Sequence, residues 1–305
     1  MERRDQTIGS LLVLLSTFGF GSLAILTQFA FRAGLNVTTT LTIRFVFASL
    51  LAWPVLIVRR QWKVSRRHAL GLVLIGCCFI ANSSTYFLAL QYAPVSAVTV
   101  IFYGYPVVVM ILSILFLGER LTWLRALAMG LALTGGMVML GLQFSGLGGP
   151  GLALAAVSGV FYALYIVLNS RLTRTIPVGV TSTWVMTGMA GAFLAYGLVS
   201  GSLDFGFQPR GWLIMLLMVV FATVLPVQFF LAGVFKIGPT IASVLGTFEP
   251  IITMVLSALL LGEQIGIYRI AGGALVLGAV LLLRIPVAAR VTVPDAVPGE
   301  LPSGV

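Results

Sequence analysis

Ten runs of predominantly apolar residues follow one another through this chain, and they constrain its fold more than any other feature. A helix needs about 20 such residues to cross a hydrocarbon core roughly 30 Å thick. Charged residues make up only 9% of the chain, against about 25% in soluble domains, so too few are available to cover a soluble surface. The sequence therefore predicts an all-α integral membrane protein. Its predicted transmembrane helices lie near residues 8–31, 38–58, 69–89, 96–117, 123–144, 149–170, 180–200, 211–233, 240–261 and 268–284.

The net charge of +10 is better explained by membrane topology than by a nucleic-acid site. If the N-terminus is cytoplasmic, 14 of the 18 Lys and Arg residues fall in inside segments. Arg32, Arg210 and Arg269 fall outside, and Arg44 lies within the second run. Because cytoplasmic loops are enriched in basic residues, this pattern predicts an even number of spans with both termini in the cytoplasm.

The two halves of the chain are copies of each other. At an offset of 144 residues Pro106 matches Pro250, and Gly118-Glu119 matches Gly262-Glu263. Five spans separate the matched elements, and five is odd, so the second copy must enter the membrane from the opposite side. The fold is therefore predicted to be two inverted five-helix repeats, an arrangement that recurs in secondary transporters with the substrate site between the halves.

The repeat also divides the chain into segments. Residues 1–7 are predicted to be a cytoplasmic N-terminus, and 8–144 and 149–289 the two repeats. Residues 290–305 contain three prolines and too few apolar residues to fold, which predicts a disordered cytoplasmic tail.

Two features resemble a known group, the EamA family of ten-helix proteins in the drug/metabolite transporter superfamily. One is the paired ending LFLGER at 115–120 and LLLGEQ at 259–264, and the other is Glu249-Pro250. The resemblance implies a transporter in the bacterial cytoplasmic (inner) membrane that exports amino acids or related small polar metabolites. Other members of this fold imply two alternatives, a riboflavin-type vitamin or a drug or organic cation as the substrate.

Glu249 is the acidic residue nearest the middle of any predicted span. A carboxylate there costs about 2.5 to 3.5 kcal/mol on insertion scales, so it must face protein or water. We interpret it as a candidate for substrate binding and for proton coupling. The alternative is a structural carboxyl that bonds the backbone groups freed by Pro250.

Further polar side chains lie within the apolar runs, where each needs a partner. They form the remaining candidates for substrate contact, although hydroxyls and amides of this kind also join helices to one another. These candidates are Asn82, Tyr86, Tyr103, Tyr162, Gln28 and Gln228. Small residues in the fifth and tenth spans, Gly136 and Gly278 among them, predict close helix contacts within the fold or across a dimer.

The remaining notable residues are predicted to be structural or to act in gating. Pro106, Pro226 and Pro250 interrupt helical hydrogen bonds near the membrane centre. Arg44 is the basic residue inside a span, and its alternatives are a counter-charge for Glu249 or for a substrate carboxylate.

Glu119 and Glu263 follow glycines at the ends of the fourth and ninth spans. We predict that these two carboxylates cap the next helix or pair with nearby arginines.

Other classes of protein are disfavoured. The single histidine, His68, lies in a basic loop, and the chain has no HExxH, GxSxG or Walker-type motif. An intramembrane enzyme, a channel and a purely structural membrane protein therefore remain as weaker alternatives. No cofactor or metal is expected, and the predicted partners are a small-molecule substrate and membrane lipids, with the chain as a monomer or homodimer.

Overall fold

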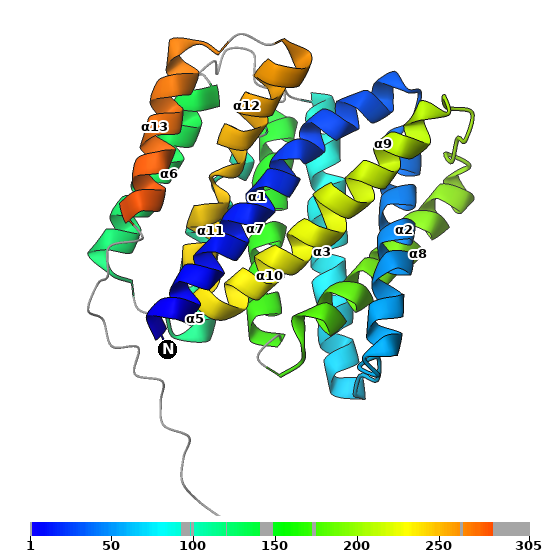
Figure 1. Cartoon of the computed structure of the whole chain (residues 1–305), viewed down its shortest axis with the longest axis horizontal. Coiled ribbons are helices and arrows are strands. Elements are labelled where there is room, and N and C mark those ends of the chain that lie inside the picture. The colour runs from blue at the N-terminus through cyan, green and yellow to red at the C-terminus, as the bar shows by residue number, and fades with distance from the viewer. Residues whose placement is uncertain are drawn as a thin grey trace, which may run out of the picture.

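The structure is a computed structural model, and it describes residues 2–92, 98, 101–119, 121–140, 149–172, 175–262 and 265–282. The predicted tail at 290–305 and Glu263 lie outside the described residues. Within these ranges the chain is helical and has no strand (Figure 1). The helices are α1 (Glu2–Arg32), α2 (Val37–Val58), α3 (Arg66–Tyr92), α5 (Tyr105–Leu117), α6 (Trp123–Leu140), α7 (Gly149–Leu172), α8 (Val178–Ser200), α9 (Arg210–Val219), the π-helix η1 (Val220–Val224), α10 (Leu225–Ile237), α11 (Pro239–Gly246), α12 (Glu249–Leu261) and α13 (Ile267–Leu282).

The prediction of about ten membrane-crossing elements is confirmed. Among the described residues, 7 segments are long and apolar enough to cross a membrane. Three shorter apolar helices, of 10–17 residues, account for the rest of the predicted spans. The predicted N-terminal segment 1–7 is largely helical, because α1 already begins at Glu2.

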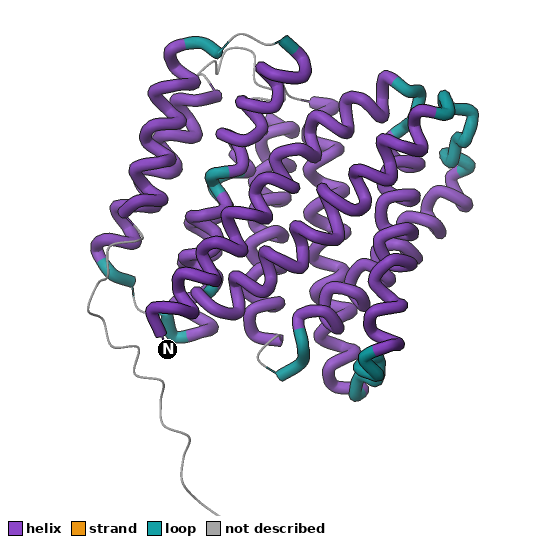
Figure 2. The backbone as a smooth tube through the Cα atoms, in the orientation of Figure 1, coloured by secondary structure: helices purple, strands orange, loops and turns teal. Residues whose placement is uncertain are grey.

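The fourth and ninth spans are interrupted at matching places. Tyr103 and Gly104 form a turn ahead of α5, and Thr247 and Phe248 form one between α11 and α12. Figure 2 shows the second interruption as a short loop segment in an otherwise helical path. In each case a proline follows as the second residue of the next helix, where its missing N–H is not needed.

The way the helices pair shows the two-fold relation between the repeats. The main pairs are α1 with α10, α3 with α7, α2 with α8, and α6 with α13. If the two repeats are exchanged, the α1–α10 pair becomes the α3–α7 pair. The α2–α8 and α6–α13 pairs stay as they are. Figure 1 shows α1 and α10 side by side, and α6 and α13 together at one edge of the bundle. The arrangement is that of two inverted five-helix repeats.

Glycines allow the closest of these contacts. A Cβ placed on Gly272 of α13 would lie 2.4 Å from the carbonyl oxygen of Gly135 on α6, so the two backbones touch. The glycines predicted from the sequence to make close contacts, Gly136 and Gly278, have open space at the Cβ position. Within this fold, the closest α6–α13 contact therefore uses Gly135 and Gly272.

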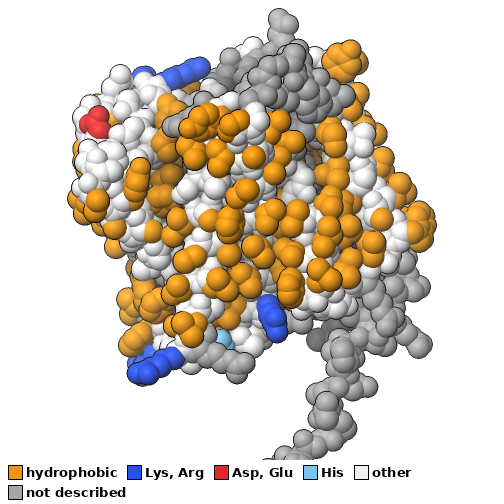
Figure 3. Space-filling model, turned by 180° about the vertical axis from the view of Figure 1, so that it is seen from behind, with side chains coloured by type: hydrophobic (Ala, Val, Ile, Leu, Met, Phe, Trp, Pro, Cys, Tyr) orange, Lys and Arg blue, Asp and Glu red, His pale blue; other side chains and the backbone are white. Residues whose placement is uncertain are grey.

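The surface side chains are distributed as expected for a protein in a membrane. Hydrophobic groups spread over the middle of the face in Figure 3, while Lys and Arg lie toward its two ends. Many large apolar side chains are exposed near the middle of their helices, such as Leu50 of α2 at 61% and Val160 of α7 at 43%. In water such exposure would be costly, but lipid tails cover it without loss. This distribution agrees with a multi-pass membrane protein.

Candidate functional site

The two helix interruptions lie against each other in the centre of the bundle. Helix α5 packs on α11, and the Tyr105 hydroxyl donates a hydrogen bond to the carbonyl oxygen of Ser243 at 3.3 Å. Tyr105 begins α5, whereas Ser243 belongs to α11 just ahead of the second interruption. The two repeats therefore meet where both have lost helical regularity, and side chains and backbone groups there are free to bond elsewhere.

Glu249 begins α12 at this meeting point and is partly buried. The Tyr103 hydroxyl, in the interruption of the other repeat, lies close enough to its carboxyl group to interact with it electrostatically. The carboxyl also interacts electrostatically with the hydroxyls of Tyr105 and Tyr162. One acidic group is thus surrounded by phenols from two other segments.

Around Glu249 the aromatic rings form one connected group, which we call the aromatic cluster. It consists of Tyr86, Phe102, Tyr103, Tyr105 and Tyr162. The ring of Phe102 lies 5.1 Å from that of Tyr86 and 5.4 Å from that of Tyr162, and Tyr105 and Tyr162 are 4.8 Å apart between centroids. These spacings are typical of favourable aromatic pairs. A carboxylate among electron-rich ring faces suits an organic cation, which both groups attract.

A cavity of about 230 Å³ adjoins this group. Tyr103 and Gly104 from one interruption, Thr247 and Pro250 from the other, and Met137 of α6 line it. Its wall is otherwise apolar, so the cavity suits a small apolar group more than a charged one. The carboxyl of Glu249 itself does not line the cavity, but its neighbour Tyr103 does.

The structure brings some of the sequence candidates together and separates others. Tyr86, Tyr103, Tyr162 and Glu249 gather at the helix interruptions. Asn82 lies four residues before Tyr86, but its amide nitrogen bonds the hydroxyl of Ser158 at 2.9 Å and joins α3 to α7. A role in substrate contact for Asn82 remains a prediction.

The two glutamines lie on other helices. Gln228 on α10 donates a hydrogen bond from its amide to the Ser182 hydroxyl of α8 at 2.6 Å. Gln28 is exposed on α1. Neither has a described contact with the aromatic cluster, and ligand contact for both remains a prediction.

Arg44 and Pro226, both predicted to be structural, meet at the π-helix η1. Proline lacks the N–H that would bond the carbonyl of Ala222, four residues earlier, and the chain widens there into the π-helix η1. The Arg44 guanidinium donates a hydrogen bond to that freed carbonyl at 3.4 Å and another to the Thr223 hydroxyl at 2.7 Å. Its described bonds thus go to η1 and not to Glu249.

Glu119 lies beyond the left-handed Gly118 that ends α5. Its carboxylate is 3.9 Å from the guanidinium of Arg125, at the outer limit of an ion pair. The predicted pairing with an arginine therefore has a geometric basis at the end of the first repeat. The matching Glu263 lies outside the described residues.

Two residues of the aromatic cluster, Phe102 and Tyr105, were not among the sequence candidates. The repeat contained a signal for Tyr105, because the offset of 144 that matches Pro106 to Pro250 also matches Tyr105 to Glu249. Phe102 had no comparable signal, since it is an apolar residue in an apolar run.

An inverted membrane bundle whose helices break at its centre beside a partly buried carboxyl has the architecture of a secondary transporter. The sequence comparison makes this specific. The model of the EamA-like transporter family matches residues 7–141 and again residues 149–285. The chain belongs to this family, and each match covers one repeat.

Individual relatives agree with the family. A protein described as an uncharacterized transporter from Archaeoglobus fulgidus is 27% identical over 284 residues, which cover 92% of this chain and 97% of the relative. The uncharacterized transporter YcbK of Bacillus subtilis is 23% identical over 289 residues, covering 88% and 90%. A crystal structure at 19% identity superposes with a TM-score of 0.77 and covers 90% of this chain and 96% of that one, so the fold is shared.

Proposed function

We propose that this transporter is a secondary carrier that exports amino acids or related small metabolites bearing an ammonium group. The observation that carries the proposal is the Glu249 carboxyl, which lies beside the hydroxyls of the aromatic cluster. An ammonium group gains from a carboxylate through charge and from aromatic faces through cation–π attraction.

The adjoining cavity supports a substrate with an apolar part. A volume of about 230 Å³ accommodates a side chain of modest size beside an ammonium group held at Glu249. Simple organic amines share both properties with neutral amino acids, so they form the second candidate class. A carboxyl group can also take up and release a proton, which is why we propose Glu249 as the coupling residue as well.

For the location we propose the bacterial cytoplasmic membrane with both termini in the cytoplasm. The described basic residues support this orientation. Arg59, Arg60 and Lys63 follow α2, and Lys236 near the end of α10 forms an ion pair with Asp5 near the start of α1. All of these belong on the cytoplasmic side if basic residues mark it.

The test is flux through the purified protein in liposomes without ATP. The panel is leucine, phenylalanine, isoamylamine, phenethylamine and riboflavin, and a gradient of each is imposed in turn. We expect the wild type to move at least one ammonium-bearing compound. Glu249→Gln should reduce that flux at least 10-fold, because a hydrogen bond to a charged group contributes about 1.5–3 kcal/mol. Asp204→Asn, in an exposed loop, serves as the matched control.

The outcomes separate the activity from the site. Absence of flux for every compound in wild-type liposomes would contradict the carrier proposal. Normal flux and an unchanged pH profile in Glu249→Gln would leave transport intact but remove Glu249 from the mechanism. Movement of riboflavin alone would favour the vitamin alternative.

A further inference from the structure

Arg44 is a buried cation whose partners among the described residues are all neutral. Its residue is 9% exposed, on α2. Its Nε donates to the Thr223 hydroxyl, one Nη donates to the Ala222 carbonyl, and the guanidinium carbon lies 5.0 Å from the centre of the Phe45 ring. A guanidinium has five N–H donors, so these two bonds leave most of them for another acceptor.

None of the described ion pairs neutralises this charge. Those pairs join Arg125 to Glu119 and Lys236 to Asp5, both near the ends of the bundle. A guanidinium in a membrane span is costly, and such groups usually pair with an anion or face a water-filled cavity. Three neutral contacts reduce that cost without removing the charge, so the remaining donors favour an anionic acceptor.

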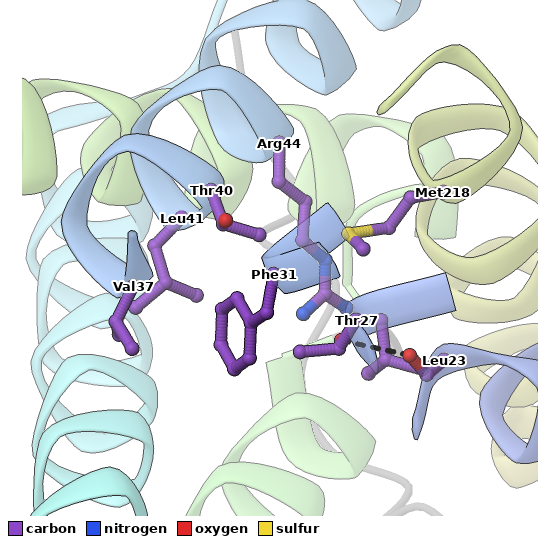
Figure 4. Close-up of a pocket in the computed structure, with 8 residues that line it drawn as sticks. All are labelled: Leu23, Thr27, Phe31, Val37, Thr40, Leu41, Arg44 and Met218. Carbon is purple, nitrogen blue, oxygen red and sulfur yellow. Dashed lines mark hydrogen bonds between the residues drawn. The ribbon is translucent and has the colours of Figure 1, made fainter. Parts of the chain in front are cut away.

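A pocket lies beside the guanidinium, between α1, α2 and α9. Thr27 and Phe31 of α1, Thr40 of α2 and Met218 of α9 line it together with Arg44. Figure 4 shows the Arg44 side chain reaching from α2 toward Thr27, with Phe31 and Met218 on either side. The pocket holds about 30 Å³, more than a single water needs and enough for a carboxylate group. Phe31, at 42% exposed, lies near its mouth at the end of α1.

We propose that this pocket, the Arg44 pocket, binds the carboxylate of a small solute. The planar fork of a guanidinium matches the two oxygens of a carboxylate, which accept two parallel hydrogen bonds. The hydroxyls of Thr27 and Thr40 donate to backbone oxygens of their own helices. Arg44 is therefore the donor to the anion, while Thr27 and Thr40 shape the walls.

The Arg44 pocket is separate from the group around Glu249. Along α1, Gly21 faces α12 and the backbone oxygen of Glu249, whereas Leu23 and Thr27 face the Arg44 pocket. Residues two positions apart on a helix point in nearly opposite directions. The inference thus does not depend on the proposed transport activity, and its test measures binding without flux.

The test uses the full protein in phosphatidylcholine nanodiscs and follows Tm with sodium propionate as the probe. Sodium chloride at equal concentration controls for ionic strength, and propionamide is the neutral isostere. A ligand that binds the native state raises Tm, here by about 2–4 °C at a concentration well above its Kd. We expect that rise with propionate in the wild type and in Arg32→Gln, an exposed arginine at the end of α1.

The same rise should be absent in Arg44→Gln, which removes the charge, and in Thr27→Leu, which fills the pocket and retains Arg44. Thr27→Leu decides the question if Arg44→Gln does not fold. No rise in the wild type, or equal rises in all four proteins, would overturn the proposal. The proposal would also be overturned if the Arg44-dependent rise in Tm occurred only in phosphatidylglycerol nanodiscs. That result would assign the site to a lipid headgroup.

Discussion

Tyr105 and Glu249 occupy the same position in the two repeats, 144 residues apart, and each stands directly ahead of the proline in the first turn of its helix. One repeat thus places a phenol where the other places a carboxyl. The inverted fold is symmetric, but its centre is not, because the acidic group belongs to one interruption alone. This asymmetry agrees with the proposed role of Glu249, because the substrate site of an inverted repeat lies where the halves meet.

The Tyr103 hydroxyl beside Glu249 leads to the first prediction, that it donates a hydrogen bond to the carboxylate during transport. Tyr103→Phe removes the hydroxyl and keeps the ring, so the aromatic cluster stays packed while the carboxyl loses a donor. We expect about 10-fold lower kcat/KM for transport, because a bond to a charged group contributes about 1.5–3 kcal/mol. Tyr196→Phe is the control, since Tyr196 is 63% exposed on α8. Equal transport by both variants would show that the bond is unimportant.

Much of the fold could be predicted from the sequence, because a membrane imposes one dominant rule. Apolar runs of sufficient length must be helices, and the repeat determined their number and inversion. The interruptions near Pro106 and Pro250 also follow from local chemistry. Pro226 is different, since its helix continues through a π-turn and does not break. The π-helix depends on Arg44, which is far from Pro226 in the sequence and donates a hydrogen bond to the Ala222 carbonyl that the proline leaves free.

The candidate site was only partly predictable, because side-chain partners depend on how the helices face one another. The sequence placed Glu249 and three tyrosines near mid-span, and the structure brings these four together. The sequence could not reveal that Asn82 faces Ser158, since periodicity gives a face of a helix but not its neighbour. For the same reason it favoured Gly136 and Gly278 over the pair that makes the α6–α13 contact.

The pairing of Asn82 with Ser158 allows a helix-joining role to be separated from a ligand contact. The amide of Asn82 donates to both oxygens of Ser158. If it only joins α3 to α7, Asn82→Ala should lower stability by about 1–2 kcal/mol and leave KM for transport unchanged. A raised KM with unchanged thermal stability would instead support the predicted substrate contact. Unfolding in detergent and flux in liposomes measure the two effects.

The contact between α6 and α13 should not tolerate an added methyl group. A Cβ on Gly272 would lie 2.4 Å from the Gly135 oxygen and 2.5 Å from the Met139 nitrogen, and neither backbone atom can turn aside. We expect Gly272→Ala to lower stability by about 1–3 kcal/mol. Gly278→Ala, on the same helix with nothing within 4 Å, should be tolerated. Similar melting of the two variants would mean that the helices separate easily.

The last prediction concerns the bond between Arg44 and Thr223. The Thr223 hydroxyl accepts from the Arg44 Nε at 2.7 Å and donates to the Met218 carbonyl, so it links the buried charge to the π-helix. Thr223→Val has nearly the same shape but leaves the guanidinium with one acceptor fewer. Since bonds to charged groups contribute about 1.5–3 kcal/mol, we expect a stability loss of that order.

Thr181 supplies the matched control for Thr223→Val. It is equally buried, at 0% exposed, but its hydroxyl oxygen has no hydrogen-bond partner in the part of the chain that the structure describes. Replacing an unpaired hydroxyl by a methyl group removes a desolvation cost, so Thr181→Val should be neutral or slightly stabilising. The measurement is chemical unfolding of both variants in the same detergent. If Thr223→Val proved as stable as Thr181→Val, the Arg44 guanidinium would have to be satisfied by water or by an anion in the adjoining pocket. Adding propionate to Thr223→Val distinguishes these two cases.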